Sequence, residues 1–209
     1  QGLLEDDQTD LGSAEADSRY QLLKRTLDRF EQAKTFGSLI DVPVEELDGL
    51  YDLINQFEQL SDTGDTMQKP VSNQLLPIVK QSLILALRYD AEVANPPYMG
   101  GKGMNIKLKK FAKDNYPCSK SDLFAIFIER GFLWLKETGF NSMVTMQSWM
   151  FLSSYERMRE NILDNYTIEN MVHMGNGVMK IAFGTNATIF RNLHMGCYKG
   201  FYSYVENSD

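Results

Sequence analysis

The tetrapeptide Asn-Pro-Pro-Tyr at residues 95–98 constrains the fold of this chain more than any other feature of its sequence. Two consecutive prolines fix the backbone φ angle and remove two N–H donors, so neither a helix nor a central strand can continue through them. The first proline also disfavours helical geometry at Asn95. Because the largely apolar residues 91–94 come immediately before, the sequence predicts a short buried strand over residues 91–95 that ends in a rigid corner.

This corner places two hydrogen-bond acceptors next to an aromatic ring. The side-chain oxygen of Asn95 and the carbonyl oxygen of Pro96 can both face outward, and Tyr98 follows two residues after Pro96. An exocyclic amine such as N6 of adenine is a poor nucleophile because its lone pair is delocalised into the ring. Two acceptors aimed at its N–H bonds would stabilise the charge that develops as the nitrogen becomes pyramidal, and the Tyr98 ring offers a face for stacking. The pattern therefore predicts a pocket for a planar amine, which a base in a duplex could reach only by flipping out of its stack.

The composition excludes several classes of protein. With 209 residues, 43% of them hydrophobic, the chain can bury a substantial core and has the composition of a soluble globular protein. No apolar stretch approaches the roughly 20 residues that a membrane span requires, and the first residues carry no signal-peptide pattern. Cys118, Cys197, His173 and His194 lack the spacing of a zinc site, so we expect reduced thiols and no metal. These features predict a cytoplasmic protein.

Charge is unevenly distributed along the chain, whose formal net charge is −7. Residues 1–17 carry six acidic side chains and no basic one, so the remainder is close to neutral. The stretch after the corner sets six lysines against the single carboxylate of Asp114. These lysines are Lys102, Lys107, Lys109, Lys110, Lys113 and Lys120. Two interpretations stay open for them, a solvated surface and a loop that contacts backbone phosphates.

The first part of the chain has the pattern of a helical segment behind an irregular lead. Residues 1–17 are acidic and without periodicity, which predicts a flexible lead. Apolar residues at helical spacing predict helices within residues 18–88. One of these helices is expected to have Asp41 as its N-cap, and another to cover residues 72–88 with Pro77 starting or kinking it.

From Tyr89 onward, strand and helix patterns alternate. The expected elements are a Gly- and Lys-rich loop at 99–117, a helix at 123–136, a strand at 141–145, a helix opened by a capping box at 153–156, a strand at 168–174 and two antiparallel strands near a sheet edge at 187–191 and 198–205. Alternation with short links predicts a parallel, doubly wound sheet. Ligands of such sheets bind outside the carboxyl ends of the strands, and Asn95 lies at one such end.

Four blocks of sequence around the corner resemble one enzyme family. They are YDAEVANPPYMGGKGMN at residues 89–105, SKSDLFAIFIER at 119–130, TMQSWMFLSS at 145–154 and AFGTNATIFRN at 182–192. With FGSLI at residues 36–40, they resemble the PglX-type N6-adenine DNA methyltransferases of BREX phage-defence systems over roughly residues 18–205. The resemblance implies an α/β fold in which residues 89–206 form the C-terminal half of a Rossmann-like S-adenosylmethionine-dependent methyltransferase sheet, preceded by a helical insertion at 18–88.

The same resemblance implies roles for individual residues and for partners. The family's pattern implies double-stranded DNA with a flipped adenine, the remainder of a parent polypeptide and other phage-defence proteins as partners, and no membrane. S-adenosylmethionine would be the cofactor of the intact parent. The implied site residues are Asn95, Pro96 and Tyr98 as catalytic residues that hold the adenine, Pro97, Lys102 and Phe183 as substrate-binding residues, with Phe183 as the second aromatic against the base, and Ser121, Asp122 and Phe124 beside the cofactor.

The sequence lacks the Gly-rich cofactor turn that such an enzyme requires. No Asp-Pro-x-x-Gly-x-Gly pattern is present, and the family places that turn upstream of the catalytic corner. The glycines at 100–103 follow the corner, and those at 175–177 have no acidic residue placed to meet a ribose. We therefore expect this chain to be the second half of a catalytic domain in a larger polypeptide, and to be inactive alone with at most weak cofactor binding.

Three other interpretations of the corner stay open. Asn-Pro-Pro-Tyr corners also serve methyltransferases that act on RNA bases or on the glutamine amide of translation release factors, because all these substrates are planar amines. A non-catalytic module that binds DNA or a partner protein is a second alternative. A Pro-Pro turn that merely ends a strand is the third.

Overall fold

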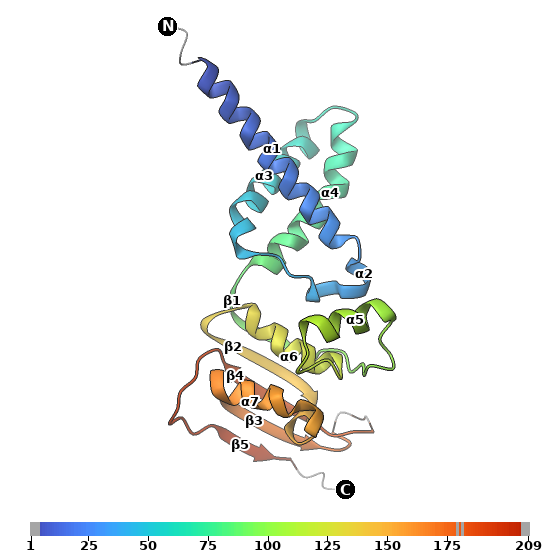
Figure 1. The fold of residues 1–209 in the computed structure, drawn as a ribbon, viewed down its shortest axis with the longest axis vertical. Coiled ribbons are helices and arrows are strands. Elements are labelled where there is room, and N and C mark those ends of the chain that lie inside the picture. The colour runs from blue at the N-terminus through green and yellow to red at the C-terminus, as the bar shows by residue number, and fades with distance from the viewer. Residues whose placement is uncertain (1–4, 179, 181, 206–209) are drawn as a thin grey trace. The chain divides into compact units, whose positions relative to one another are not determined.

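A computed structural model describes residues 5–178, 180 and 182–205, with side chains from Glu15 onward. The chain divides into two compact units, Gln1–Leu87 and Arg88–Asp209 (Figure 1). The first unit is helical, and the second contains all the strands in the described part of the chain.

The helical unit consists of α1 (Glu5–Phe30), α2 (Ala33–Phe36), α3 (Leu47–Thr63) and α4 (Gln68–Ala86). Short 3-10 turns at Gly37–Leu39 and Val44–Glu46 connect α2 to α3. Burying apolar side chains against one another provides the main stabilisation of such a unit. The fully or nearly fully buried residues of this core include Val42, Leu50, Leu53, Val79 and Ala86.

The predicted helices of this unit are present, but three of their starts were wrong, including that of the helix predicted at 72–88, which is α4 and spans Gln68–Ala86. Residues 5–17 belong to α1, where the sequence predicted an irregular lead; alanines and glutamate in this stretch favour a helix that extends from the apolar turns after it. Whether that segment is flexible stays a prediction, and residues 1–4 lie outside the described part. Asp41 does not cap α3, because a 3-10 turn follows Pro43 and the helix begins at Leu47. Pro77 lies inside α4.

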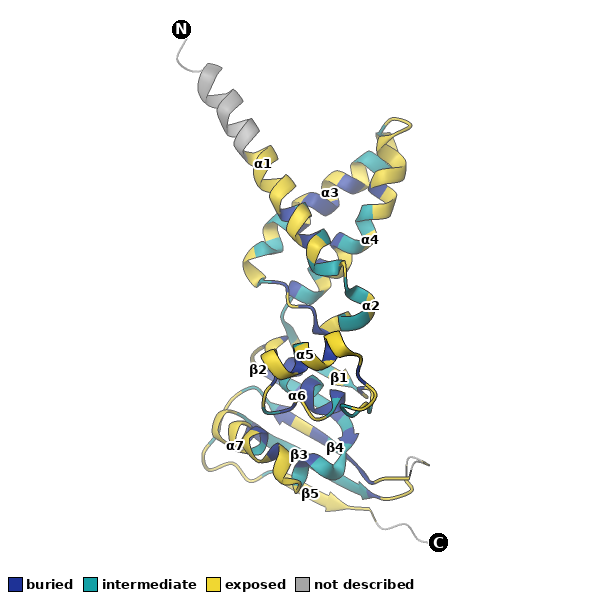
Figure 2. Cartoon of the chain, turned by 45° about the vertical axis from the view of Figure 1, so that its right-hand side comes forward, coloured by how far each residue is buried: buried dark blue, intermediate teal, exposed yellow. Residues whose placement is uncertain are grey.

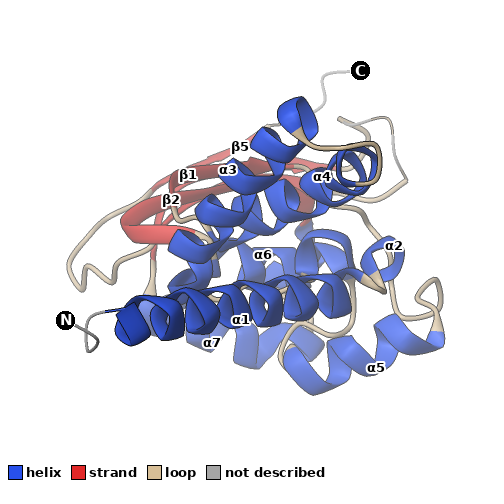
Figure 3. Ribbon diagram, turned by 90° about the horizontal axis from the view of Figure 1, so that it is seen from above, coloured by secondary structure: helices blue, strands red, loops and turns tan. Residues whose placement is uncertain are grey.

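The second unit is built on one five-stranded sheet, shown as a red layer in Figure 3. Its strands are β1 (Tyr89–Ala94), β2 (Leu135–Met146), β3 (Thr167–Gly175), β4 (Thr185–Arg191) and β5 (Phe201–Tyr204), in the order β1-β2-β4-β3-β5. β1 runs parallel to β2 and β3 runs parallel to β5, whereas β4 is antiparallel to both β2 and β3. The sheet is therefore mixed.

The α/β class and the antiparallel direction of β4 are confirmed, whereas the prediction of a parallel, doubly wound sheet with both antiparallel strands near an edge was wrong in part. The link from β3 to β4 contains only residues 176–184, which is too short for a crossover between parallel strands, so β4 returns antiparallel. β4 was expected near a sheet edge but lies between β2 and β3. β5 does lie at an edge and is exposed along its length (Figure 2), but it is parallel to its neighbour.

Three helices connect or cover the strands: α5 (Ile106–Asn115), α6 (Leu123–Leu133) and α7 (Glu156–Asn165). Residues of α6 and α7 share one core with inward-facing sheet residues, so both helices cover the same face. The main buried members of this core are Phe124, Ile128, Phe132, Met143, Trp149, Tyr155, Met158, Ile162 and Phe190.

Several predictions in this unit were wrong. The strand predicted as buried at 91–95 is β1, which spans Tyr89–Ala94 and has no buried residue, because β1 lies at the edge of the described sheet. The expected loop at 99–117 contains α5, which lysine- and glycine-rich composition had concealed. Helix α6 ends at Leu133 rather than at 136, and the strand expected at 141–145 spans 135–146. A shift in the β1–β2 register across residues 136–139 marks a bulge, with φ of 67° at Thr138, so residues 135 and 136, predicted as helical, belong to the strand. α7 is confirmed, but a 3-10 turn at Ser153–Tyr155 replaces the expected capping box.

Candidate functional site

The corner at the end of β1 is held by the hydroxyl of Tyr98. This hydroxyl donates to Oδ1 of Asn95 at 3.0 Å and lies 3.3 Å from the carbonyl oxygen of Val144. Asn95 is exposed, Pro96 is buried and Tyr98 is half-buried. Because an amide oxygen has two lone pairs, Oδ1 of Asn95 can accept a second hydrogen bond from a ligand while Tyr98 orients it.

Two phenylalanines pack edge-on against the Tyr98 ring. The ring centroid of Phe124 lies 6.2 Å away at an interplanar angle of 88°, and that of Phe183 lies 6.0 Å away at 69°. Phe124 is completely buried, whereas Phe183 is 39% exposed. The structure thus brings Phe183, about 85 residues further along the chain, to the same corner as Tyr98. Its proposed contact with a base stays a prediction.

The carboxylate of Asp122 joins the loop after Tyr98 to the start of α6. Its Oδ1 accepts from the backbone N–H of Met99 at 2.8 Å and from that of Phe124 at 3.3 Å. Two backbone hydrogen bonds, from Leu123 N to the Met99 carbonyl at 3.1 Å and from Gly101 N to the Ser121 carbonyl at 3.1 Å, complete a short paired segment. Burial raises the pKa of Asp122, although the backbone N–H groups it accepts from act in the opposite direction.

Tyr155 packs against Phe124, which in turn contacts Tyr98, and the sequence did not identify Tyr155 as a residue of the site. Its ring lies 5.8 Å from that of Phe124, and only 4% of the residue is exposed. Burial, together with the negative charge of Asp122, raises the pKa of Tyr155 to about 12. The only sequence signal for Tyr155 was its place in the expected capping box, which gave no indication of a contact with Phe124.

The remaining predicted residues lie on the segments next to the corner and make no described contact with Tyr98. Pro97, Ser121 and Lys102 are exposed. Lys102 makes no hydrogen bond or ion pair with Asn95 or Tyr98 in the described part of the chain. The structure therefore unites Asn95, Tyr98, Phe124 and Phe183 by direct contact, and places Lys102 on the adjoining loop.

A hydrogen bond between Gln147 and His173 supports the segment that carries Phe183. Oε1 of Gln147 lies 2.5 Å from Nε2 of His173, and the Gln147 N–H donates to the Gly184 carbonyl at 2.9 Å. A side chain at Gly184 would collide with the Gln147 amide, since a Cβ there would lie 2.2 Å from its Oε1. His173 is therefore a hydrogen-bonded structural histidine, and its neighbours place Phe183.

Glu92 is an unexpected carboxylate on β1, three residues before Asn95. It pairs in register with Asn141, which is completely buried. Oε2 of Glu92 and Oδ1 of Asn141 are both buried without a hydrogen-bond partner among the described residues. Burial raises the pKa of Glu92 to about 7. A protonated Glu92 could donate a hydrogen bond in this environment, which a carboxylate cannot do.

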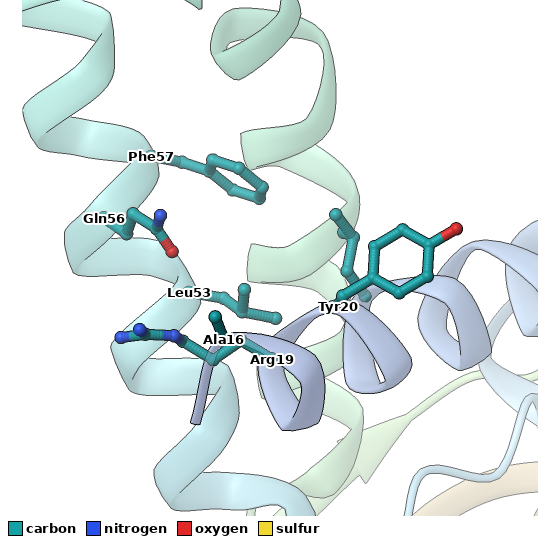
Figure 4. A pocket seen from close by; sticks show the side chains of 7 residues that line it. Ala16, Arg19, Tyr20, Leu53, Gln56 and Phe57 are labelled. Carbon is teal, nitrogen blue, oxygen red and sulfur yellow. The ribbon is translucent and has the colours of Figure 1, made fainter. Parts of the chain in front are cut away.

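The helical unit has a hollow of its own, between α1 and α3 (Figure 4). It has a volume of about 210 Å³ and is lined by Ala16, Arg19, Tyr20, Leu23, Leu53, Gln56 and Phe57. None of the predicted site residues lies there.

Comparison with known proteins gives the following matches. The family model described as Eco57I restriction-modification methylase matches residues 15–179. The chain is 50% identical over 197 residues to the adenine-specific methyltransferase BrxX of Escherichia coli O9:H4 (strain HS), covering 92% of this chain and 16% of that protein. It is 39% identical over 158 residues to the adenine-specific methyltransferase PglX of Lacticaseibacillus casei (strain Zhang), covering 73% of this chain and 13% of that protein. The chain thus spans a small part of the length of these relatives.

One similar solved structure is a putative class I S-adenosylmethionine-dependent methyltransferase from Listeria monocytogenes. It is 12% identical with a TM-score of 0.47, over 91% of this chain and 75% of that chain. Separately, among the described residues we find no helix with the length and apolar character that a membrane crossing requires.

The raised pKa of Glu92 predicts a pH-dependent stability. Because the folded state holds this proton up to a pH of about 7 while the unfolded value is near 4.5, the free energy of unfolding should fall as pH rises between these values. The Glu92→Gln variant, which is neutral throughout, should therefore melt at a higher temperature than the wild type above pH 7, with the difference vanishing towards pH 4.5. Thermal melts across this range measure the effect.

Glu137→Gln is the matched control, since it removes an exposed carboxylate from the neighbouring strand β2. If the melting temperatures of Glu92→Gln and the wild type differ by the same amount at all pH values, the raised pKa of Glu92 is contradicted.

Proposed function

The chain belongs to the Eco57I restriction-modification methylase family, and on that premise we propose that it supplies the target-adenine pocket of an adenine-specific DNA methyltransferase. The observation that carries the proposal is the corner itself, in which Tyr98 orients the Asn95 amide oxygen and packs against Phe183. The 50% identity to an adenine-specific methyltransferase supports the choice of substrate.

In this proposal the chain's own residues prepare the amine for attack. Oδ1 of Asn95 and the carbonyl oxygen of Pro96 accept hydrogen bonds from the two N–H groups of adenine N6. These hydrogen bonds stabilise the positive charge that develops on nitrogen. The Tyr98 ring stacks on the flipped base, and Pro97 lies beside that base. Phe183, from the segment before β4, closes the pocket. When bound, S-adenosylmethionine supplies an electrophilic methyl group. None of these acceptor or stacking groups has to change its protonation state.

The residues at the start of α6 fit one wall of a cofactor site. Ser121 is exposed and adjoins Asp122 at the N-terminal end of the helix. Phe124 is completely buried behind Tyr98, so it shapes the wall without being open to a ligand. We propose that Ser121 and Asp122 face the cofactor, with Phe124 in support, while a Gly-rich turn from another segment holds the rest.

The sheet supports the idea that another segment completes the domain. β1 pairs only with β2 in the described part of the chain, and Val93 on it is 83% exposed. The sheet face opposite α6 and α7 carries a shallow apolar hollow of about 290 Å³ lined by residues of β1, β2, β3 and β4. Parallel strands are normally covered on both faces. We propose that further strands pair with β1, that helices cover this face, and that this additional segment carries the cofactor turn.

The wider setting follows from the same relatives. The proposed partners are double-stranded DNA with a flipped adenine, the rest of the parent polypeptide and other phage-defence proteins, in the cytoplasm. Both relatives are much longer than this chain, which supports a parent polypeptide of several domains.

In the intact protein, substitutions at the corner should distinguish the acceptor role of Asn95 from the orienting role of the Tyr98 hydroxyl. Asn95→Ala removes one acceptor and should lower the methylation rate by roughly 10²–10³-fold. Tyr98→Phe keeps the ring but loses the hydrogen bond to Asn95, and should cost about fivefold. The measurement is N6-methyladenine formation on duplex DNA by mass spectrometry, with Asn165→Ala, an exposed asparagine at the end of α7, as the control. Unchanged methylation by Asn95→Ala would overturn the proposal that this corner holds the adenine, and an intact wild-type protein that forms no N6-methyladenine would favour a non-catalytic module.

The isolated chain should bind S-adenosylmethionine weakly or not at all, because it has only one wall of the site. Isothermal titration of the 209-residue chain with the cofactor measures this directly. Tight binding with one-to-one stoichiometry would refute the view that the cofactor turn lies on another segment.

A further inference from the structure

The loop that follows the corner presents a concentrated basic surface. Residues 102–120, here named the lysine excursion, carry six lysines and one acidic residue, Asp114. All six lysine side chains are exposed. Because the chain as a whole has a formal net charge of −7, this segment contrasts sharply with the rest of the sequence.

The base of the lysine excursion is fixed beside Tyr98 by a short paired segment. Gly100 and Asp122 form an isolated antiparallel bridge, and the Asp122 carboxylate accepts from the N–H of Met99 at 2.8 Å. Residues 99–101 are thereby hydrogen-bonded to residues 121–123. The excursion therefore starts and ends within a few residues of the candidate base-binding site.

Helix α5 gives the excursion a defined shape. Asn105 caps it by accepting from Leu108 N at 2.8 Å, and Leu108 and Ala112 are buried. Lys109, Lys110 and Lys113 project from its exposed positions. Ten helical residues span about 15 Å, a length along which one DNA strand carries about four phosphates.

Most of these lysines lack a compensating carboxylate. Lys80 and Lys136 elsewhere form ion pairs with Glu58 and Asp90, at 2.6 and 3.0 Å. By contrast, five lysines of the excursion have no ion pair within the part of the chain that the structure describes. They are Lys102, Lys109, Lys110, Lys113 and Lys120.

We propose that the lysine excursion, mainly through Lys109, Lys110 and Lys113, binds the backbone phosphates of the duplex that flanks the flipped adenine. This proposal rests on the proposed function, because it is the position of the excursion beside the adenine pocket that selects duplex DNA as its partner. Phosphate contacts of this kind set affinity and register rather than sequence preference.

The test compares salt dependence of DNA binding in the intact protein that carries this chain. Lys109→Glu, Lys110→Glu and Lys113→Glu are combined, and the affinity for a short labelled duplex is measured by fluorescence anisotropy at several salt concentrations. The logarithmic slope of affinity against salt should become shallower by about 2–3, since each lost phosphate contact removes about 0.9. A parallel variant with three glutamines checks that the effect does not come from added repulsion.

The matched control replaces three exposed lysines of the helical unit by glutamate, and so changes the net charge by the same amount. These lysines are Lys24, Lys34 and Lys69. The proposal predicts a change of slope for the excursion variants alone, with circular dichroism and melting temperature unchanged. Equal slopes for both sets, or no change in either, would overturn it.

The methylation activity of the Asn95→Ala variant, measured in parallel, tells a failure of the proposed adenine pocket from a failure of the proposed phosphate-binding surface. If Asn95→Ala loses methylation while the excursion variants bind DNA as the wild type does, only the surface assignment fails. If Asn95→Ala still methylates, the proposed function fails, whatever the salt slopes show.

Discussion

The carboxylate of Asp122 links the corner after β1 to the start of α6, and the arrangement of the candidate site rests on this link. The carboxylate accepts from Met99 N just after the Pro-Pro corner and from Phe124 N in the first turn of α6, so it ties two segments separated by more than twenty residues. That tie places the Phe124 ring behind Tyr98 and closes the base of the lysine excursion. Hydrogen bonds to an ionised acceptor are the stronger ones. A single group thus connects the corner, the helix that covers the sheet and the basic surface.

The Pro-Pro pair explains why the end of β1 could be predicted from sequence, since its geometric consequences are local. The errors arose where tertiary context overrides local pattern. Residues 135 and 136 were predicted to end the helix, but a bulge around Thr138 lets β2 start at Leu135, with Lys136 paired to Asp90 across the strands. α5 was missed because its lysines and the glycines before it concealed the buried Leu108 and Ala112.

In the candidate site, too, local features could be predicted from the sequence, whereas contacts that depend on tertiary packing could not. Tyr98 contacts both Asn95 and Phe183 in the structure, whereas the roles of these side chains toward a base stay predictions. The Val144 carbonyl and the Tyr155 ring could not be predicted, because each reaches the corner only through the packing of β2 and α7 against α6. Glu92 gave no signal either: a carboxylate in a strand is ordinary in sequence, and only its register with the buried Asn141 makes it unusual.

The central claim is that a flipped adenine stacks on Tyr98 at this corner. Photocrosslinking tests it most directly: the target adenine of a duplex is replaced by 5-iodouracil, the intact protein is bound and irradiated, and the attached peptide is identified by mass spectrometry. The account predicts a crosslink to Tyr98 that is lost in Tyr98→Ala. A crosslink to a segment that carries neither Tyr98 nor Phe183, with both rings unmodified, would contradict it.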